Sequence, residues 1–246
     1  MTIKKAVFFG ILTPIIIYSL FLGFDFLSKP GVEKPEAIVA SFQLTPTQII
    51  NSLPDRHLIK TFFIPQSPEK DWSQPWQDAC EEASLLTVNY YYSSVNPDPK
   101  QLLDDYQEIF NFESKNQWGH DVNLSQMAQV GLDLFGLKSK IIENPDLKTI
   151  KEYLVKDIPI IITANGKTLF SENKHFKAGG PWYHSLVILG FDDQKSQFIV
   201  HDVGTQFGAY FRYSYQLLLN SIHDWPATGQ KENINTGRQA VLILLK

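Results

Sequence analysis

Cysteine is almost absent from this chain: Cys80 is the only one among 246 residues. A single thiol excludes an intramolecular disulfide framework and any zinc site built on several cysteines. Basic clusters are also lacking, and because the formal net charge is -4, no electrostatic signature of nucleic-acid binding is present. The composition is 43% hydrophobic and 13% aromatic, without repeats or low-complexity tracts, which is typical of a folded domain.

Charge is missing from one long N-terminal run, residues 6–24 (AVFFGILTPIIIYSLFLGF). Its length suits a spanning helix, which needs about 17–25 residues. Lys4 and Lys5 precede the run and Asp25 follows it, so the positive-inside rule predicts a cytoplasmic N-terminus. A cleaved signal peptide is the alternative, but no small-x-small cleavage site follows. We therefore expect residues 1–26 to be an uncleaved single-pass anchor in the cell membrane, with the rest of the chain extracytoplasmic.

The remainder divides into a linker and lead-in over residues 27–58 and a domain over residues 59–246. Proline, glycine and scattered charges mark the linker. In the domain, apolar periodicity and turn signals predict helices at 80–92, from 99 onward, 124–134, 146–156 and 215–222. They predict strands at 59–64, 138–142, 158–163, 183–190, 197–201, 209–213 and 240–245, with a turn at Asn165-Gly166. Helices come first and an antiparallel sheet follows, so the fold class is α+β.

Cys80 lies in the stretch WSQPWQDACEEASLLTVNYYY, residues 72–92. We expect a helix to begin there, with Asp78 as N-cap and Glu81 completing a capping box. A thiol in the first turn lies at the positive end of the helix dipole, which favours the thiolate. The nearby carboxylates of Glu81 and Glu82 act in the opposite direction, because negative charge raises the pKa of a thiol. Since a lone cysteine is more often a buried hydrophobe, catalysis requires a base elsewhere in the chain.

His184 is the strongest candidate base among the six histidines. It opens an apolar strand directly after the turn at 179–183, which predicts a position at the edge of a cleft. A hairpin of strands 184–190 and 197–201 would bring His184 beside Asp202. A carboxylate next to an imidazole fixes its tautomer and stabilises the imidazolium, as the third member of a nucleophile–base–orienter triad does. Upstream of the thiol, the amide of Gln74 or Gln77 is a candidate donor to an oxyanion.

Three pieces of the chain, QPWQDACEEASL, HSLVILGFDD and FIVHDVG, resemble the bacteriocin-processing-peptidase-like cysteine peptidases, cysteine-peptidase family 39. The similarity covers about 59–244 and is strongest to the exported, uncharacterised bacterial branch. It implies a papain-like fold, with the nucleophile on a helix N-terminus packed against an antiparallel sheet, and no metal or organic cofactor. It also implies that Cys80 is the nucleophile, His184 the general base and acid, and Asp202 the orienter.

In that family a glutamine six positions before the cysteine lines the oxyanion hole, which here is Gln74, with Gln77 as a close competitor. Glu81 and Glu82 depart from the family pattern, since small residues commonly follow the cysteine in the leader-processing members. This departure argues against a double-glycine leader as substrate and leaves the chemistry unaffected.

The predicted function is therefore a membrane-anchored extracytoplasmic cysteine peptidase that hydrolyses peptide bonds through a thioester. Expected partners are a peptide or protein substrate and the membrane, and not nucleic acid. One alternative is an acyltransferase or transglutaminase-like enzyme with the same triad, and another is a catalytically silent, membrane-tethered module that binds peptides. A metal site of His175, His184, His201 and Asp202 is disfavoured, because the last two are adjacent on a strand and point to opposite faces.

Overall fold

The structure, a computed structural model, describes residues 53–246. The predicted anchor at residues 1–26 and most of the predicted linker lie outside the described residues. Within the described range, no helix combines the length and the apolar character needed to cross a bilayer.

A seven-stranded antiparallel sheet forms the centre of the fold, in the order β2-β7-β3-β4-β5-β6, with β1 also paired to β4. The strands are β1 Arg56–Leu58, β2 Lys138–Glu143, β3 Ile160–Asn165, β4 Tyr183–Asp192, β5 Gln197–His201, β6 Phe211–Ser214 and β7 Ala240–Leu245. Along one edge, β4 pairs first with β3 and then, from Gly190 onward, with β1. Gly190 permits this second pairing, because an added Cβ would lie 2.3 Å from the backbone oxygen of His57. The strand that carries the predicted base is thus held by three neighbours.

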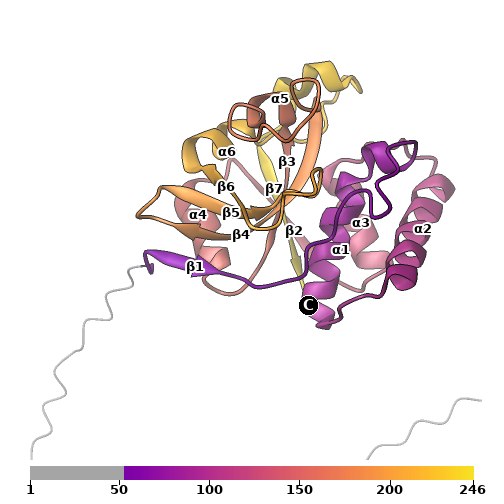
Figure 1. Ribbon diagram of the computed structural model, residues 1–246, viewed down its shortest axis with the longest axis horizontal. Coiled ribbons are helices and arrows are strands. Elements are labelled where there is room, and N and C mark those ends of the chain that lie inside the picture. Colours follow the sequence, from indigo (N-terminus) through magenta and orange to yellow (C-terminus); the bar gives the residue numbers. More distant parts are fainter. Residues whose placement is uncertain (1–52) are drawn as a thin grey trace, which may run out of the picture. The chain divides into compact units, whose positions relative to one another are not determined.

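Helices cover both faces of this sheet. In the described part of the chain they are α1 Cys80–Ser93, α2 Pro99–Lys115, α3 Leu124–Asp133, α4 Leu147–Leu154, α5 Gly166–Leu169 and α6 Tyr215–Ser221, with short 3-10 segments at Trp76–Asp78 and Lys231–Thr236. Figure 1 shows α1, α2 and α3 on one side of the sheet and α4 and α6 on the other. Because both faces are covered, every residue of β3 and β4 is buried. The predicted α+β class is confirmed.

Helix α1 packs against β4, α2 and α3. Ala83, Leu86 and Tyr90 are buried, and so are the acidic residues Glu81 and Glu82 just before them. The helix that begins at the thiol therefore has no solvent-facing side in its first turns, and its carboxyl groups must find partners inside the domain.

Two predicted helix starts are confirmed by their caps. The side chain of Asp98 accepts from the backbone N–H of Gln101 at the start of α2, where Pro99 occupies the first turn. At the start of α3, Asn123 and Gln126 form a capping box. Both caps are local, because each depends only on residues within one turn.

The strand predicted at residues 59–64 is wrong. The residues that pair with β4 are those of β1, just upstream and inside the region assigned to the lead-in. Beyond Leu58 the chain leaves the sheet to reach α1. Ile59 and Ile64 are each 2% exposed, so their apolar side chains fill the core without pairing as a strand.

The predicted capping box at Cys80 is also wrong. The N-cap of α1 is Ala79, without a side-chain hydrogen bond. The carboxylate of Asp78 instead accepts from the amide of Gln74, and a carboxyl oxygen of Glu81 accepts from the backbone N–H of Val122. Farther along, Asn165-Gly166 is not a simple turn, because Asn165 caps the short helix α5.

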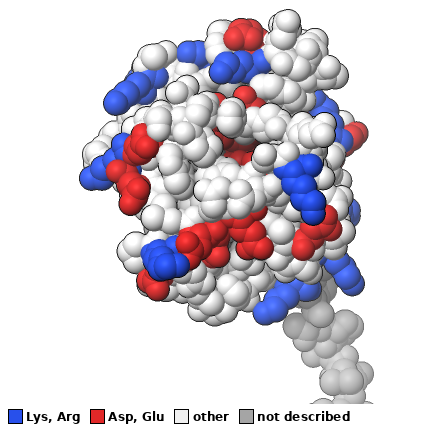
Figure 2. Space-filling view, turned by 90° about the vertical axis from the view of Figure 1, so that its right-hand side faces the viewer, with Lys and Arg blue, Asp and Glu red and all other residues white. Residues whose placement is uncertain are grey.

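Charged side chains are mixed on the face of the domain that carries α2. Figure 2 shows Lys and Arg side chains spaced apart around this face, with Asp and Glu side chains between them. This face therefore presents no broad positive surface.

Candidate active site

Cys80 is the first residue of α1, and only Ala79 separates it from the 3-10 turn Trp76–Asp78. Gln66 holds this turn: its Nε2 donates to the carbonyl oxygens of Trp76 at 3.0 Å and Gln77 at 2.7 Å. The first backbone N–H groups of a helix have no partner within the helix. The N–H of Cys80 is thus placed to meet negative charge that develops beside the sulfur.

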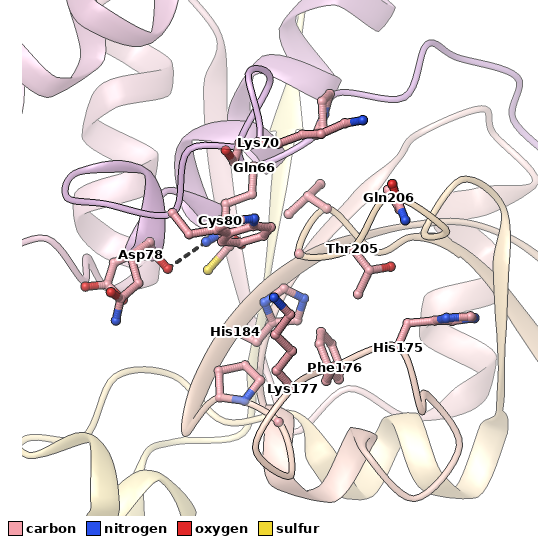
Figure 3. A pocket seen from close by; sticks show the side chains of 18 of the residues that line it. Gln66, Lys70, Asp78, Cys80, His175, Phe176, Lys177, His184, Thr205 and Gln206 are labelled. Carbon is pink, nitrogen blue, oxygen red and sulfur yellow. Dashed lines mark hydrogen bonds between the residues drawn. The ribbon is translucent and has the colours of Figure 1, made fainter.

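The sulfur of Cys80 lies against the start of β4. The backbone N–H of Ser185 donates to Sγ at 3.2 Å, and Oε2 of Glu81 lies 2.8 Å from Sγ. Because Ser185 directly follows His184, the sulfur sits beside the backbone of the predicted base. Figure 3 shows the sulfur directed toward the side of the cleft that holds His184.

His184 and Asp202 form a buried pair. Nε2 of His184 lies 2.9 Å from Oδ1 of Asp202, and the two residues are 1% and 0% exposed. In the hairpin, His201 is paired with Val187, so Asp202 is not directly opposite His184 and the two side chains bridge the offset. Since Nε2 is occupied by the carboxylate, Nδ1 is the ring nitrogen left to exchange a proton with a thiol.

Asp202 is held by two further donors. Its Oδ2 accepts from the amide of Asn173 at 2.8 Å and from the hydroxyl of Tyr213. Burial alone would raise the pKa of Asp202, but the nearby His184 and these hydrogen bonds outweigh it and hold that pKa below its ordinary value. The group facing the imidazole is therefore a carboxylate at neutral pH.

Cys80 and His184 line a cleft of about 810 Å³. Figure 3 shows Gln66, Lys70 and Cys80 on one wall, and His175, Phe176, Lys177 and His184 on the other. Two aromatic residues of the lining are open to solvent, Trp72 at 47% and Phe207 at 55% exposed. The cleft thus combines a deep polar end at the sulfur with an apolar, accessible rim, as sites for extended ligands commonly do.

Comparison with known proteins identifies the family of this chain. A family model described as the Peptidase_C39 like family matches residues 63–233, well over half of the chain. The chain belongs to the C39-like peptidase family. A solved structure of a candidate C39-like peptidase from Bacillus anthracis is similar, with 13% identity, a TM-score of 0.48, and coverage of 78% of this chain and 98% of that one. No match was found among curated proteins.

Three glutamines of this C39-like protein differ in their access to the cleft. Gln74, predicted to line the oxyanion hole, donates its amide to Asp78 at 2.6 Å and is not among the residues that line the cleft. Gln77 lines the cleft and is exposed. Gln66 lines it as well and is only 4% exposed. Sequence reasoning missed Gln66, although a polar residue directly after the apolar run FFIP is a signal for a side chain at the edge of a core.

The thiol of Cys80 is not activated in this resting arrangement. Burial, first, and the adjacent Glu81, second, raise its pKa well above the ordinary value, and the N–H of Ser185 only partly offsets them. The expected preference for thiolate from the helix dipole is therefore outweighed by desolvation. Attack by this sulfur therefore requires a proton acceptor.

The two other histidines of the disfavoured metal site, His175 and His201, pack against aromatic rings. His175 packs its ring on Phe207, with centroids 4.4 Å apart. His201 lies among aromatic rings, 4.6 Å from that of Tyr210, and burial lowers its pKa to about 4. Among residues 53–246, no three His, Cys, Asp or Glu residues are grouped so that they could hold a metal ion.

Proposed function

We propose that this C39-like protein is a cysteine peptidase in which Cys80 is the nucleophile, His184 the general base and acid, and Asp202 the residue that orients the imidazole. The observation that carries the proposal is the contact of 2.9 Å between His184 and Asp202, made beside a sulfur that accepts from the N–H of Ser185. Cys80 and His184 line one cleft, and Asp202 is buried behind the imidazole, which supports a nucleophile–base–orienter arrangement.

The catalytic steps follow from which ring nitrogen is free. Nδ1 of His184 takes the thiol proton as Sγ attacks the carbonyl carbon of a peptide, and the resulting imidazolium is stabilised by the carboxylate of Asp202. The same Nδ1 then gives its proton to the leaving amine, which leaves a thioester on Cys80. A water molecule, deprotonated by His184, hydrolyses the thioester and restores the thiol.

The oxyanion of the tetrahedral intermediate needs preorganised donors. The backbone N–H of Cys80 is one such donor. For the side-chain donor, Gln66 is favoured over Gln74, because Gln66 is fixed in the cleft wall by its contacts to the turn before Cys80. Gln77 is the remaining candidate, but its exposed side chain is less fixed. Gln66 gives up one of its two carbonyl contacts when it turns an N–H to the oxyanion.

Membrane attachment belongs to the same proposal but rests on sequence alone. The uncharged run at residues 6–24, preceded by Lys4 and Lys5, supports an anchor with the peptidase domain outside the cytoplasm. The test is whether intact cells protect the domain from an added protease. The protease should digest the domain in intact cells. Digestion only after the cells are lysed would overturn this orientation.

The central test combines cleavage with labelling of the thiol. The full chain is incubated with a denatured protein, and products are identified by mass spectrometry; Cys80→Ser and His184→Ala should each lose at least about 10³-fold in rate. Iodoacetamide at pH 6 should label Cys80 faster in the wild type than in His184→Ala. Equally slow labelling with no cleavage would favour a catalytically silent binding module. Products joined to an added amine, without hydrolysis, would favour an acyltransferase.

A further inference from the structure

Glu81 touches the sulfur that the proposed mechanism uses. Its Oε2 lies 2.8 Å from Sγ of Cys80, whereas its Oε1 accepts from the backbone N–H of Val122 at 3.0 Å. Glu81 is 0% exposed, and within the described residues it forms no ion pair with Lys, Arg or His. A buried carboxyl group without a cation is costly to ionise, so its proton is part of the site's chemistry.

The two contacts decide where the proton of a neutral Glu81 resides. Oε1 receives an N–H and so acts as an acceptor, which leaves Oε2 as the oxygen that carries the hydrogen. That hydrogen then points at Sγ. The sulfur also accepts from the N–H of Ser185. With a neutral Glu81, Sγ therefore has two hydrogen-bond donors, one from each residue, and this arrangement stabilises a thiolate. An ionised Glu81 instead accepts from the thiol and repels a thiolate.

Titratable groups face Glu81 from α1, from the loop before α3 and from β4. On α1 they are Cys80 and Glu82; from the loop before α3, Asp121 faces it. From β4 come Tyr183 and His184, the residue before the Ser185 N–H that donates to the sulfur. Burial, and then the charge of Asp121, raise the pKa of Glu81 well above its ordinary value. Asp121 lines the cleft, and its own pKa is raised to about 6, mainly by burial.

We propose that Glu81 is a catalytic residue of the peptidase, which as a neutral carboxylic acid donates its proton in a hydrogen bond to the thiolate of Cys80 and, when ionised, holds Cys80 as a thiol. This inference rests on the proposed function and adds a proton-controlled partner to the nucleophile. The active form has Glu81 protonated, Cys80 as thiolate and His184 as imidazolium. The inactive form has Glu81 ionised, Cys80 as thiol and His184 neutral. The two differ by one proton, taken from water, so lower pH favours the active form.

Alkylation of Cys80 tests this directly, because it is the only thiol in the chain. The rate of reaction of the full chain with iodoacetamide is measured from pH 4.5 to 8.5. For the wild type the rate should fall with rising pH above a midpoint, approaching tenfold per pH unit. Glu81→Gln keeps an N–H donor but cannot ionise, so its rate should change less than about twofold across the same range.

Glu82→Gln is the matched control. Glu82 is equally buried and adjacent on α1 but does not touch the sulfur, so this variant should keep the falling wild-type profile. A Glu81→Gln profile that falls like the wild type would overturn the proposal, as would a wild-type rate that does not fall. Peptide hydrolysis is measured separately. If the alkylation rate falls with pH as expected but no peptide is cleaved, the control of Cys80 by Glu81 stands and the proposed peptidase function is overturned.

Asp121→Asn provides a second variant that leaves Glu81 in place. Removing the charge of Asp121 should lower the pKa of Glu81, because that charge is the second cause of its elevation. The midpoint of the alkylation profile should therefore move to lower pH. A midpoint that stays in place or moves upward would assign the pH dependence to another group and overturn the proposal, even if Glu81→Gln does not fold.

Discussion

The backbone of Gly204 lies directly against the imidazole of His184: a methyl group added at Gly204 would come within 2.7 Å of Cε1 and 3.3 Å of Nε2. On another side, the ring of Phe176 meets the imidazole edge-on, with centroids 5.2 Å apart. The orientation of the His184 imidazole is thus fixed both by packing and by the hydrogen bond to Asp202. Because general-base catalysis depends on where the accepting nitrogen points, this contact links a backbone position to the rate of the reaction.

Gly204→Ala should lower kcat while leaving the fold intact. The added methyl group must displace the imidazole or the loop that carries residue 204, and a misplacement of about 1 Å costs up to about 10²-fold in rate. The measurement is kcat together with the melting temperature. Gly119→Ala is the control, because a Cβ there meets no atom within 4 Å. Equal kcat values for the two variants would show that the contact at Gly204 does not position His184.

Asp202→Asn should lower kcat by about 10²–10⁴-fold with little change in KM. Asn173 and Tyr213 both donate to Oδ2 of Asp202, so the amide oxygen of the new side chain is drawn to that place. Its NH₂ then faces Nε2 of His184, which forces the imidazole proton onto Nδ1. In that tautomer His184 cannot accept the thiol proton. Steady-state kinetics measures the effect, and a variant with wild-type kcat would contradict this role of Asp202.

The closeness of His184 and Asp202 was predictable from the sequence because local signals placed both residues. His184 lies at the start of an apolar strand, the next predicted strand forms a hairpin with it, and Asp202 follows that second strand. These signals use neighbours along the chain, so they survive without knowledge of the tertiary fold.

The misses have a common physical cause. The capping box predicted for Asp78 and Glu81 is absent because other donors bind both carboxyl groups. The amide of Gln74 donates to Asp78, and the backbone N–H of Val122 donates to Glu81. Gln66 escaped notice for the same reason. Its part in the site comes from hydrogen bonds to a turn some ten residues away, which no periodic pattern reveals.

Gln66→Ala should reduce kcat by about 10²-fold, whereas Gln74→Ala should stay within about threefold of the wild type. The difference follows from position, because Gln66 lines the cleft and Gln74 does not. Removing Gln66 also frees the turn before Cys80, so the melting temperature must be measured for each variant. A larger loss for Gln74→Ala would restore the assignment of that residue to the oxyanion hole.

Phe207→Ala should raise KM for peptides with an aromatic or large apolar side chain, by about three- to tenfold, and leave kcat nearly unchanged. The ring is 55% exposed at the cleft rim, so it loses water when such a side chain packs on it. Leu132→Ala is the control: Leu132 is 50% exposed on α3 and lies outside the cleft lining. A KM that rises equally for both variants, or for neither, would argue against binding at Phe207.

Glu113→Gln should stabilise the domain at alkaline pH and not at acid pH. Glu113 is 4% exposed, and burial raises its pKa from 4.5 to about 7. The folded state therefore binds a proton that the unfolded state releases, so stability is full below about pH 4.5 and is lost as the pH rises through 7. This loss is at most about 3 kcal/mol.

Urea unfolding of the full chain at pH 5 and pH 8 measures the effect of Glu113→Gln on stability. Glu108→Gln, at an exposed position on the same helix, is the control. The advantage of Glu113→Gln should be small at pH 5 and approach about 3 kcal/mol at pH 8. An equal effect at the two pH values would assign it to packing and not to ionisation of the buried carboxyl group.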